Sequence, residues 1–281
     1  MSGAALSYVL GRSPEEYARL TLQGRILRPY TEGFFRAAGI TTGMRVLDIG
    51  CGMGDVSMLA GDIVGPGGRV LGIDMDATVL ENARQRVIGH GCAPWVSFEQ
   101  ASIADFSSPQ EFDALVGRAI LLYLPDAGAT LRRLLSNVKP GGIAAFHDVD
   151  MIDLGRSEPP CPLWDRSVQL LRDAFERAGA SLNAGRRLGN IFLRAGLPYP
   201  TLVCETPVGG GPGSYLYPWC AATVASVAPQ LTGLGLELPS ELAPLETLAA
   251  RLEEEAVRQG AQLLASHQYG AWARKPFSSG A

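Results

Sequence analysis

Val46-Leu-Asp-Ile-Gly-Cys-Gly-Met-Gly-Asp55 carries the strongest structural signal in the chain. It starts as a short apolar strand and runs directly into Gly50, Gly52 and Gly54. Without Cβ atoms the backbone can turn sharply there, and a ligand can approach the amino end of the following helix. A glycine-rich turn on its own is also compatible with a purely structural role, and the assignment of a ligand needs a second signal.

Acidic residues around this turn supply that signal. Asp74 closes the next apolar strand, about 20 residues after Gly54, where a carboxylate can accept both ribose hydroxyls of a nucleoside. Asp48 and Asp55 flank the glycines and would repel a pyrophosphate, whereas the ammonium and sulfonium groups of S-adenosylmethionine would be attracted. The Gly-Lys-Ser/Thr sequence of a phosphate-binding loop does not follow.

Outward from the turn, apolar strands alternate with helical segments. This alternation predicts a doubly wound, mostly parallel α/β sheet of the Rossmann-like kind with seven strands. We expect three regions: an N-terminal helical lid over 1–42, a cofactor-binding core over 43–150, and a C-terminal part over 151–281. The last region would carry a helical substrate cap at about 209–265, before the closing strand. Strands are expected at 45–49, 69–74, 96–99, 112–117, 143–149, 201–208 and 268–274, and later helices at 163–178, 188–195 and 248–264.

These motifs together resemble class I S-adenosylmethionine-dependent methyltransferases of the bacterial small-molecule type, over about residues 40–150. The resemblance implies S-adenosylmethionine as cofactor. The three glycines would line its methionine and ribose portion, and Asp74 would bind the ribose. The other cofactor contacts implied or suggested by the resemblance are Tyr17, Gln23, Asp48, Met75, Ser102, Ile103 and Arg118.

Several of these positions leave alternatives open. Many family members carry Asp where this chain has Ser102, so Asp105 is an alternative contact for the adenine amino group. Arg118 follows the fourth strand and could pair with the cofactor carboxylate, or form a surface ion pair. Tyr17 and Gln23 resemble an N-terminal helix that touches the cofactor in some members, and plain helix packing is the alternative.

His147 and Asp148 end the fifth strand and are the candidate general bases. The carboxyl ends of strands face the ligand crevice in such sheets, and the histidine pKa lies near neutrality without tuning. The alternative is a hydrogen-bonded structural histidine. We expect no metal, because alternation places the two side chains on opposite faces of the strand. Four aromatic residues outside the core indicate either a pocket for a flat substrate or simple packing of the cap: Trp164, Tyr215, Tyr217 and Trp219.

Composition narrows the class of partner. The chain has 281 residues and a formal net charge of −4, without a basic stripe, which disfavours nucleic acid. The Arg132-Arg133 pair is expected on a solvated helix face. Apolar runs are too short for a membrane span, and five cysteines without a Cys-x-x-Cys motif suit a reducing cytoplasm. A homodimer is left open.

The sequence therefore predicts transfer of a methyl group to a small, aromatic or apolar metabolite of the secondary-metabolism type. The accepting atom, oxygen, nitrogen or carbon, is undecided. One alternative is an NAD-dependent oxidoreductase, although Asp55 stands where a Gly-x-Gly-x-x-Gly pattern needs glycine. A second is a protein that binds the cofactor without catalysis.

Overall fold

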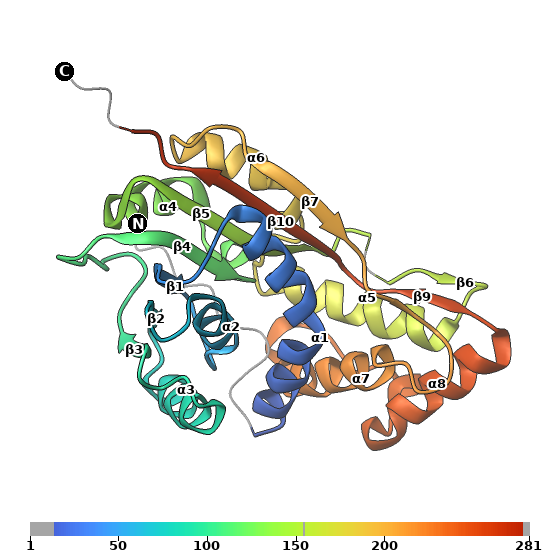
Figure 1. The fold of residues 1–281 in the computed structure, drawn as a ribbon. Helices are drawn as coiled ribbons and strands as arrows, with labels where there is room; N and C mark the ends of the chain where they lie inside the picture. The colour runs from blue at the N-terminus through green and yellow to red at the C-terminus, as the bar shows by residue number, and fades with distance from the viewer. Residues whose placement is uncertain (1–13, 154, 278–281) are drawn as a thin grey trace. The chain divides into compact units, whose positions relative to one another are not determined.

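The computed structural model describes residues 14–153 and 155–277 of the chain (Figure 1). Helices and strands alternate through the first half, as the apolar pattern predicts. The helices are α1 (Pro14–Ala38), α2 (Asp55–Val64), α3 (Ala77–His90), α4 (Ala127–Leu134), α5 (Pro162–Arg177), α6 (Ala184–Arg194), α7 (Leu216–Val227) and α8 (Leu248–Gln259). The strands are β1 (Arg45–Ile49), β2 (Arg69–Asp74), β3 (Val96–Gln100), β4 (Phe112–Arg118), β5 (Val138–Asp150), β6 (Ser157–Glu158), β7 (Thr201–Glu205), β8 (Val208–Gly209), β9 (Gln262–Leu264) and β10 (His267–Arg274).

Seven strands form one sheet in the order β3-β2-β1-β4-β5-β10-β7. β1 lies at the point where the order reverses and pairs in parallel with β2 on one side and β4 on the other. β4 in turn pairs in parallel with β5. This is the mostly parallel, Rossmann-like sheet predicted from the sequence. Ligands bind at the carboxyl ends of the strands at such a reversal, so the turn after β1 stands at the expected place.

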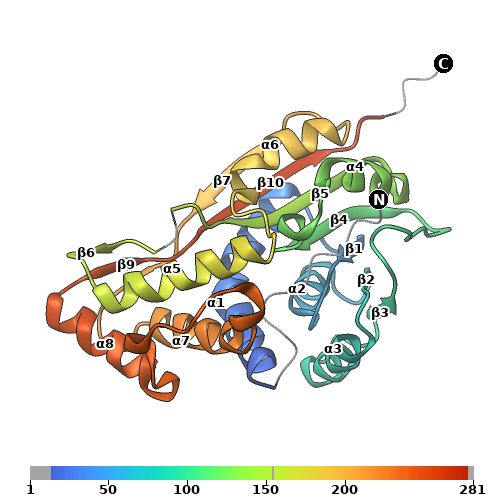
Figure 2. The ribbon, with the colours of Figure 1, turned by 180° about the vertical axis from the view of Figure 1, so that it is seen from behind.

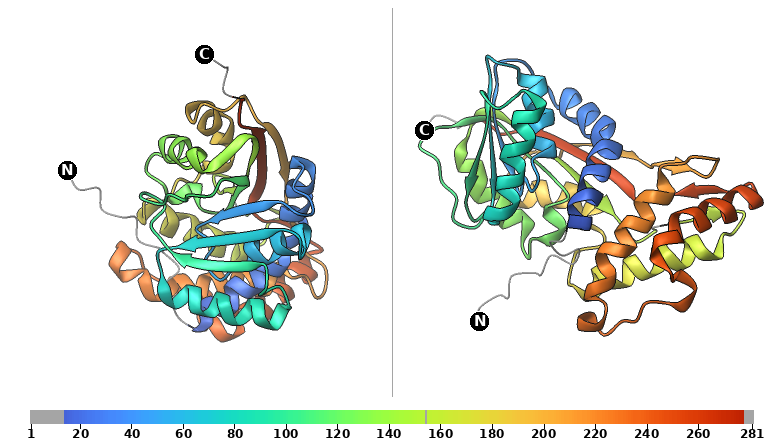
Figure 3. Two further views of the ribbon diagram at one scale, coloured as in Figure 1. Left: turned by 60° about the vertical axis from the view of Figure 1, so that its left-hand side comes forward. Right: turned by 90° about the horizontal axis from the view of Figure 1, so that it is seen from below.

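Two compact units are distinguished along the chain. One comprises residues 27–148, 184–204 and 269–277 and holds most of the seven-stranded sheet. In it, α2, α3 and the second half of α1 pack on one face of the sheet through residues such as Phe35, Val56 and Val87. α4 and α6 cover the other face through Leu131, Phe192 and their neighbours (Figure 3).

The other unit comprises residues 14–26, 149–183 and 205–268. It contains α5, α7 and α8, which pack against one another, and the small sheet β6-β9-β8 (Figure 2). The helix expected over 248–264 is shorter than predicted, because Gly260 adopts a left-handed φ of 61° and ends α8. The residues that follow pair as β9 with β6 and β8.

Residues 1–13, the first part of the expected N-terminal helical lid, lie outside the described part. The boundaries 1–42, 43–150 and 151–281 stay a prediction. None of the described helices is long and apolar enough to cross a membrane.

Gly50, Gly52 and Gly54 all have positive φ, but their surroundings differ. A Cβ on Gly54 would lie 2.8 Å from the Phe98 ring, and one on Gly50 2.5 Å from Ile120, whereas a Cβ on Gly52 would meet nothing within 4 Å. Two of the glycines therefore admit neighbouring side chains, and Gly52 alone faces open space.

We predict that Gly54→Ala destabilises the fold more than Gly52→Ala. Both variants place alanine at a left-handed φ, but only the first also overpacks the turn, which costs about 1–3 kcal/mol more. Urea unfolding of the two variants measures the difference. Equal stabilities would contradict the packing role assigned to Gly54.

Candidate cofactor site

Asp74 joins the ends of β1 and β2. Its Oδ2 accepts a hydrogen bond from the Gly52 amide at 3.0 Å, and its Oδ1 accepts one from the Asp76 amide at 3.0 Å. A carboxylate has about four lone-pair positions, so two backbone contacts leave capacity for ligand hydroxyls. Asp74 is half-buried and thus available at the open side of the turn.

Asp48 is a buried acid below the same turn, with 1% of its surface exposed. The Ser57 hydroxyl donates to its Oδ2 at 2.6 Å, while its Oδ1 is buried and has no hydrogen-bond partner among the described residues. Burial raises the pKa of Asp48 to about 7, although the Ser57 hydrogen bond and the charge of Arg118 oppose the shift. An unsatisfied buried oxygen is costly unless a ligand supplies its partner.

Asp55 differs from the sequence expectation. Arg86 of α3 forms a two-pronged ion pair with it, with nitrogen–oxygen distances of 2.8 and 3.0 Å, and also donates to the Met53 carbonyl at 2.6 Å. The negative charge of Asp55 is thus balanced within the protein. This ion pair weakens the argument that Asp55 repels a pyrophosphate, and the repulsion expected of Asp48 and Asp55 stays a prediction.

The loop after β3 holds the expected adenine contacts. Ser102 is exposed and uses its hydroxyl to accept from the Ala104 amide at 3.1 Å. Ile103 is half-buried against the core, and Met75, after β2, is 65% exposed. Arg133 of α4 donates to the carbonyls of Phe106, at 2.8 Å, and Ile103.

Arg133 was expected on a solvated helix face, and for this residue the expectation is wrong. It anchors the loop because α4 passes beside it, a proximity that no local pattern reveals. Its neighbour Arg132 is exposed, as predicted. Of the expected adenine contacts, Ser102 and Ile103 lie on this anchored loop, and their contact with adenine stays a prediction.

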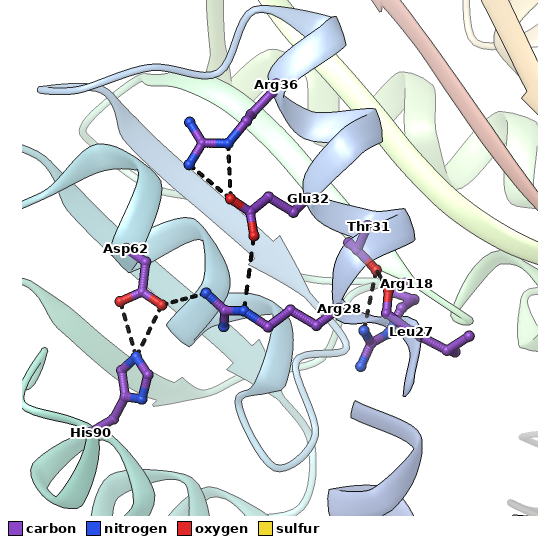
Figure 4. Close-up of polar contacts among 8 residues, drawn as sticks. All are labelled: Leu27, Arg28, Thr31, Glu32, Arg36, Asp62, His90 and Arg118. Atoms are coloured by element: carbon purple, nitrogen blue, oxygen red, sulfur yellow. Dashed lines mark hydrogen bonds and ion pairs between the residues drawn. The ribbon is translucent and has the colours of Figure 1, made fainter. Parts of the chain in front are cut away.

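Arg118 is the last residue of β4 and belongs to a second polar cluster (Figure 4). Its Nη1 donates to the Thr31 hydroxyl of α1 at 3.2 Å. Burial lowers the pKa of Arg118, and the carboxylates of Asp55 and Asp48 oppose that shift. The guanidinium therefore interacts electrostatically with the acids of the glycine turn, and it donates one hydrogen bond to the Thr31 hydroxyl on α1.

His147 and Asp148 are fully buried and point to opposite faces of β5. The Nδ1 atom of His147 lies 2.9 Å from the Thr31 hydroxyl, and the Phe34 ring packs edge-on at a centroid distance of 5.1 Å. Asp148 accepts from the Leu121 amide at 2.9 Å. Both residues thus have structural partners, and their role as general bases stays a prediction.

The remaining expected residues belong to the other compact unit. Gln23 accepts a hydrogen bond from Arg19 at 2.5 Å, and Arg19 also forms a buried ion pair with Glu16. Tyr17 is half-buried on the same helix. The contact of Tyr17 and Gln23 with the cofactor stays a prediction.

The four aromatic residues of the expected substrate pocket are Trp164 on α5, Tyr217 and Trp219 on α7, and Tyr215, which directly precedes α7. Trp164 and Tyr217 are buried, and the Tyr217 hydroxyl donates to the Gly211 carbonyl at 3.2 Å. The Trp164 indole nitrogen has no partner among the described residues. Tyr215 is 36% exposed and Trp219 is half-buried. Two of the four thus pack in the interior, and two reach the surface.

The family model described as "Methyltransferase domain" matches residues 40–182, just over half of the chain. This chain belongs to that methyltransferase family. The matched region contains the glycine turn, Asp74, the loop after β3, Arg118 and His147. The predicted resemblance to class I S-adenosylmethionine-dependent methyltransferases is confirmed at the level of family and fold, and S-adenosylmethionine is the cofactor of this domain.

Curated relatives match over part of their length. The chain is 34% identical over 111 residues to a trans-aconitate 2-methyltransferase of Rhodopseudomonas palustris, which covers 39% of this chain and 40% of that protein. It is 33% identical over 122 residues to a ubiquinone/menaquinone biosynthesis C-methyltransferase of Cellvibrio japonicus, covering 43% and 49%. A trans-aconitate 2-methyltransferase of Afipia carboxidovorans aligns over 75% of this chain and 78% of its own at 26% identity. The chain thus spans less than half the length of the first two relatives.

Solved structures share the fold. The YcgJ protein of Bacillus subtilis superposes with a TM-score of 0.56 at 16% identity, over 88% of this chain and 98% of its own. A [4+2]-cyclase, SpnF, gives 0.53 at 17% identity, over 89% and 82%.

The residues of the turn fit S-adenosylmethionine. Gly52 faces open space that a Cβ would fill, and the buried Asp48 has an oxygen atom without a partner in the described chain. Both features lie at the carboxyl end of β1, and both suit a ligand that carries positive charge and approaches the backbone closely.

We predict that Asp48→Asn removes a pH-dependent loss of stability. The folded protein keeps the Asp48 proton up to about pH 7, whereas the unfolded chain loses it near 3.8. The stabilising contribution of this group to the free energy of unfolding is therefore fully present below pH 3.8 and is lost as the pH rises through 7. The free energy of unfolding of the variant minus that of the native protein should increase between about pH 4 and 7. Urea unfolding across that range measures it, and a constant difference would contradict the raised pKa.

Proposed function

We propose that the protein transfers the methyl group of S-adenosylmethionine to a small, apolar or aromatic metabolite. The observation that carries the proposal is the pairing of a buried acid and a cation at the glycine turn. Asp48 and Arg118 interact electrostatically, and each is only partly satisfied by the protein. The amino-acid end of the cofactor carries one ammonium and one carboxylate, which complement this pair.

The chain would bind the two ends of the cofactor with separate groups. Asp48 would accept from the ammonium, and that positive charge favours the ionised carboxylate over the protonated one. Arg118 would donate to the carboxylate, as guanidinium groups do readily. Asp74 would accept from the ribose hydroxyls while it keeps the Gly52 amide in place. Met75, Ser102 and Ile103 would surround the adenine.

The bound cofactor supplies a methyl group on a sulfonium, a good leaving group for in-line displacement. The protein's own task is then to align the acceptor and exclude water. A base is needed only when the acceptor loses a proton. Tyr215 and Trp219, which are the less buried of the four aromatic residues, are the proposed substrate contacts, together with Trp164 and Tyr217.

The substrate class is supported by chemistry rather than by relatives. A net charge of −4 without a basic stripe does not suit a polyanionic substrate. One group of relatives is named for trans-aconitate and another for ubiquinone and menaquinone biosynthesis, and this chain covers less than half the length of the first ones. The acceptor atom thus stays open among oxygen, nitrogen and carbon. A cytoplasmic location completes the proposal, and a homodimer stays open.

We predict that Asp74→Ala abolishes binding of S-adenosylhomocysteine and leaves the protein folded. The variant loses the ribose acceptor and the contact with Gly52. Calorimetry with S-adenosylhomocysteine measures the affinity, and thermal unfolding checks the fold. Asp76→Asn is the matched control, because asparagine still caps α3. Unchanged affinity of Asp74→Ala would refute the ribose assignment, and native protein stabilised by NAD alone would refute the proposed function.

We predict that His147→Ala lowers turnover at least roughly tenfold if the acceptor is a hydroxyl group, which is the low end of general-base catalysis. A catalytic base alters the pH profile of kcat and leaves the affinity for S-adenosylhomocysteine unchanged. A positioning role through Thr31 instead weakens that affinity. Unaltered turnover would point to methylation of nitrogen or carbon without a base. The assay uses labelled cofactor with a panel of small aromatic and carboxylic metabolites.

A further inference from the structure

Thr31, in the second half of α1, is fully buried and was not singled out by the sequence. Its hydroxyl lies 3.0 Å from the Leu27 carbonyl and 3.2 Å from Nη1 of Arg118 (Figure 4). A third polar neighbour is the Nδ1 atom of His147, at 2.9 Å. All four residues belong to the same compact unit. One hydroxyl therefore links a helix to the ends of two central strands.

The hydrogen-bond roles in this cluster follow from the number of hydrogens. Arg118 can only donate, and the threonine hydroxyl has one hydrogen and two lone pairs. When that hydrogen goes to the Leu27 carbonyl, the hydroxyl oxygen accepts from both Arg118 and Nδ1 of His147. Both lone pairs of the Thr31 oxygen then accept hydrogen bonds, and the position of the Arg118 guanidinium depends on its bond to this hydroxyl.

The strands bring the two donors together. Arg118 and His147 are register partners in the parallel pair of β4 and β5, and the Ala119 amide donates to the His147 carbonyl at 2.8 Å. Ala119 has a φ of 51°, which is rare for a residue other than glycine and costs energy that the surroundings must offset. The chain is thus held in a strained turn directly after Arg118.

The other guanidinium nitrogens are available. Among the described residues, the Nη1 atom of Arg118 has a hydrogen-bond partner, the Thr31 hydroxyl. None of the Arg118 nitrogens is a buried atom that lacks a partner in that part of the chain. The side chain interacts electrostatically with Asp55 and Asp48 at the glycine turn. Arg118 is therefore anchored at one end and can donate to a ligand with its remaining N–H groups.

We propose that Thr31 is a positioning residue, whose hydroxyl holds Arg118 so that the guanidinium receives the carboxylate of the cofactor. This inference rests on the proposed function. A threonine with a merely structural role would contribute to stability, and its loss would weaken binding of all parts of the cofactor alike. A positioning role instead acts on the amino-acid end alone.

The test compares two ligands by calorimetry on the full chain. S-adenosylhomocysteine carries the carboxylate, and 5′-methylthioadenosine has the same nucleoside and sulfur without the amino-acid end. Thr31→Val, which keeps the shape and removes the hydroxyl, should weaken S-adenosylhomocysteine about tenfold and change 5′-methylthioadenosine less than about twofold. Thr31→Ser retains the hydroxyl and should restore most of the affinity.

Arg118→Gln supplies the matched comparison. In the double variant with Thr31→Val, the affinity for S-adenosylhomocysteine should fall no further than in Arg118→Gln alone, because the two residues act through one contact. Equal weakening of both ligands by Thr31→Val, or no weakening where Arg118→Gln shows it, would overturn the role of Thr31 and leave the proposed function standing. If the native protein binds neither ligand, the proposed function itself fails, and the role of Thr31 with it.

Discussion

The hydrogen bond from the Gly52 amide to the Asp74 carboxylate is the contact on which the site depends. It connects the turn after β1 to the end of β2, which run side by side in parallel with Asp48 opposite Gly72. Gly52 has a left-handed φ and nothing near its missing Cβ. The Asp74 carboxylate accepts from its amide, while the neighbouring Cys51 and Gly54 amides donate to backbone carbonyls. One carboxylate thus both shapes the turn and stands at its open side.

The charged side chains around this turn lie in pairs of opposite sign. Arg86 balances Asp55 on the surface side of α2, whereas Asp48 is buried and lies within the field of Arg118. Asp48, whose pKa is raised to about 7, is ionised more readily beside a positively charged group, and the Arg118 guanidinium has N–H groups left to donate to a negatively charged one. This arrangement favours a zwitterionic ligand end over a pyrophosphate, which offers negative charge alone.

The fold and the core of the cofactor site could be predicted because their signals are local. Five apolar strands alternate with helices, and the glycines and Asp74 lie at fixed distances along the chain, so the sheet and the turn were recognised correctly. Arg86, Arg133 and Thr31 could not be found in this way. Each acts on residues about 30 to 120 positions away, through a contact created by packing of α1, α3 or α4 against the strand ends. The balanced charge of Asp55 and the anchored loop at Ile103 were missed for the same reason.

The sequence by itself determined the alternation of strands and helices in the first half of the chain, the glycine turn and the membership of a methyltransferase family, because strand alternation and turn geometry are properties of neighbouring residues. The tertiary structure decided which charges are balanced, which polar atoms are buried, and what holds Arg118. It did so because burial and hydrogen-bond partners arise only when distant segments pack together. The glycine turn therefore indicates the cofactor. Packing adds Arg86 at the turn, Arg133 at the loop after β3 and Thr31 beside Arg118.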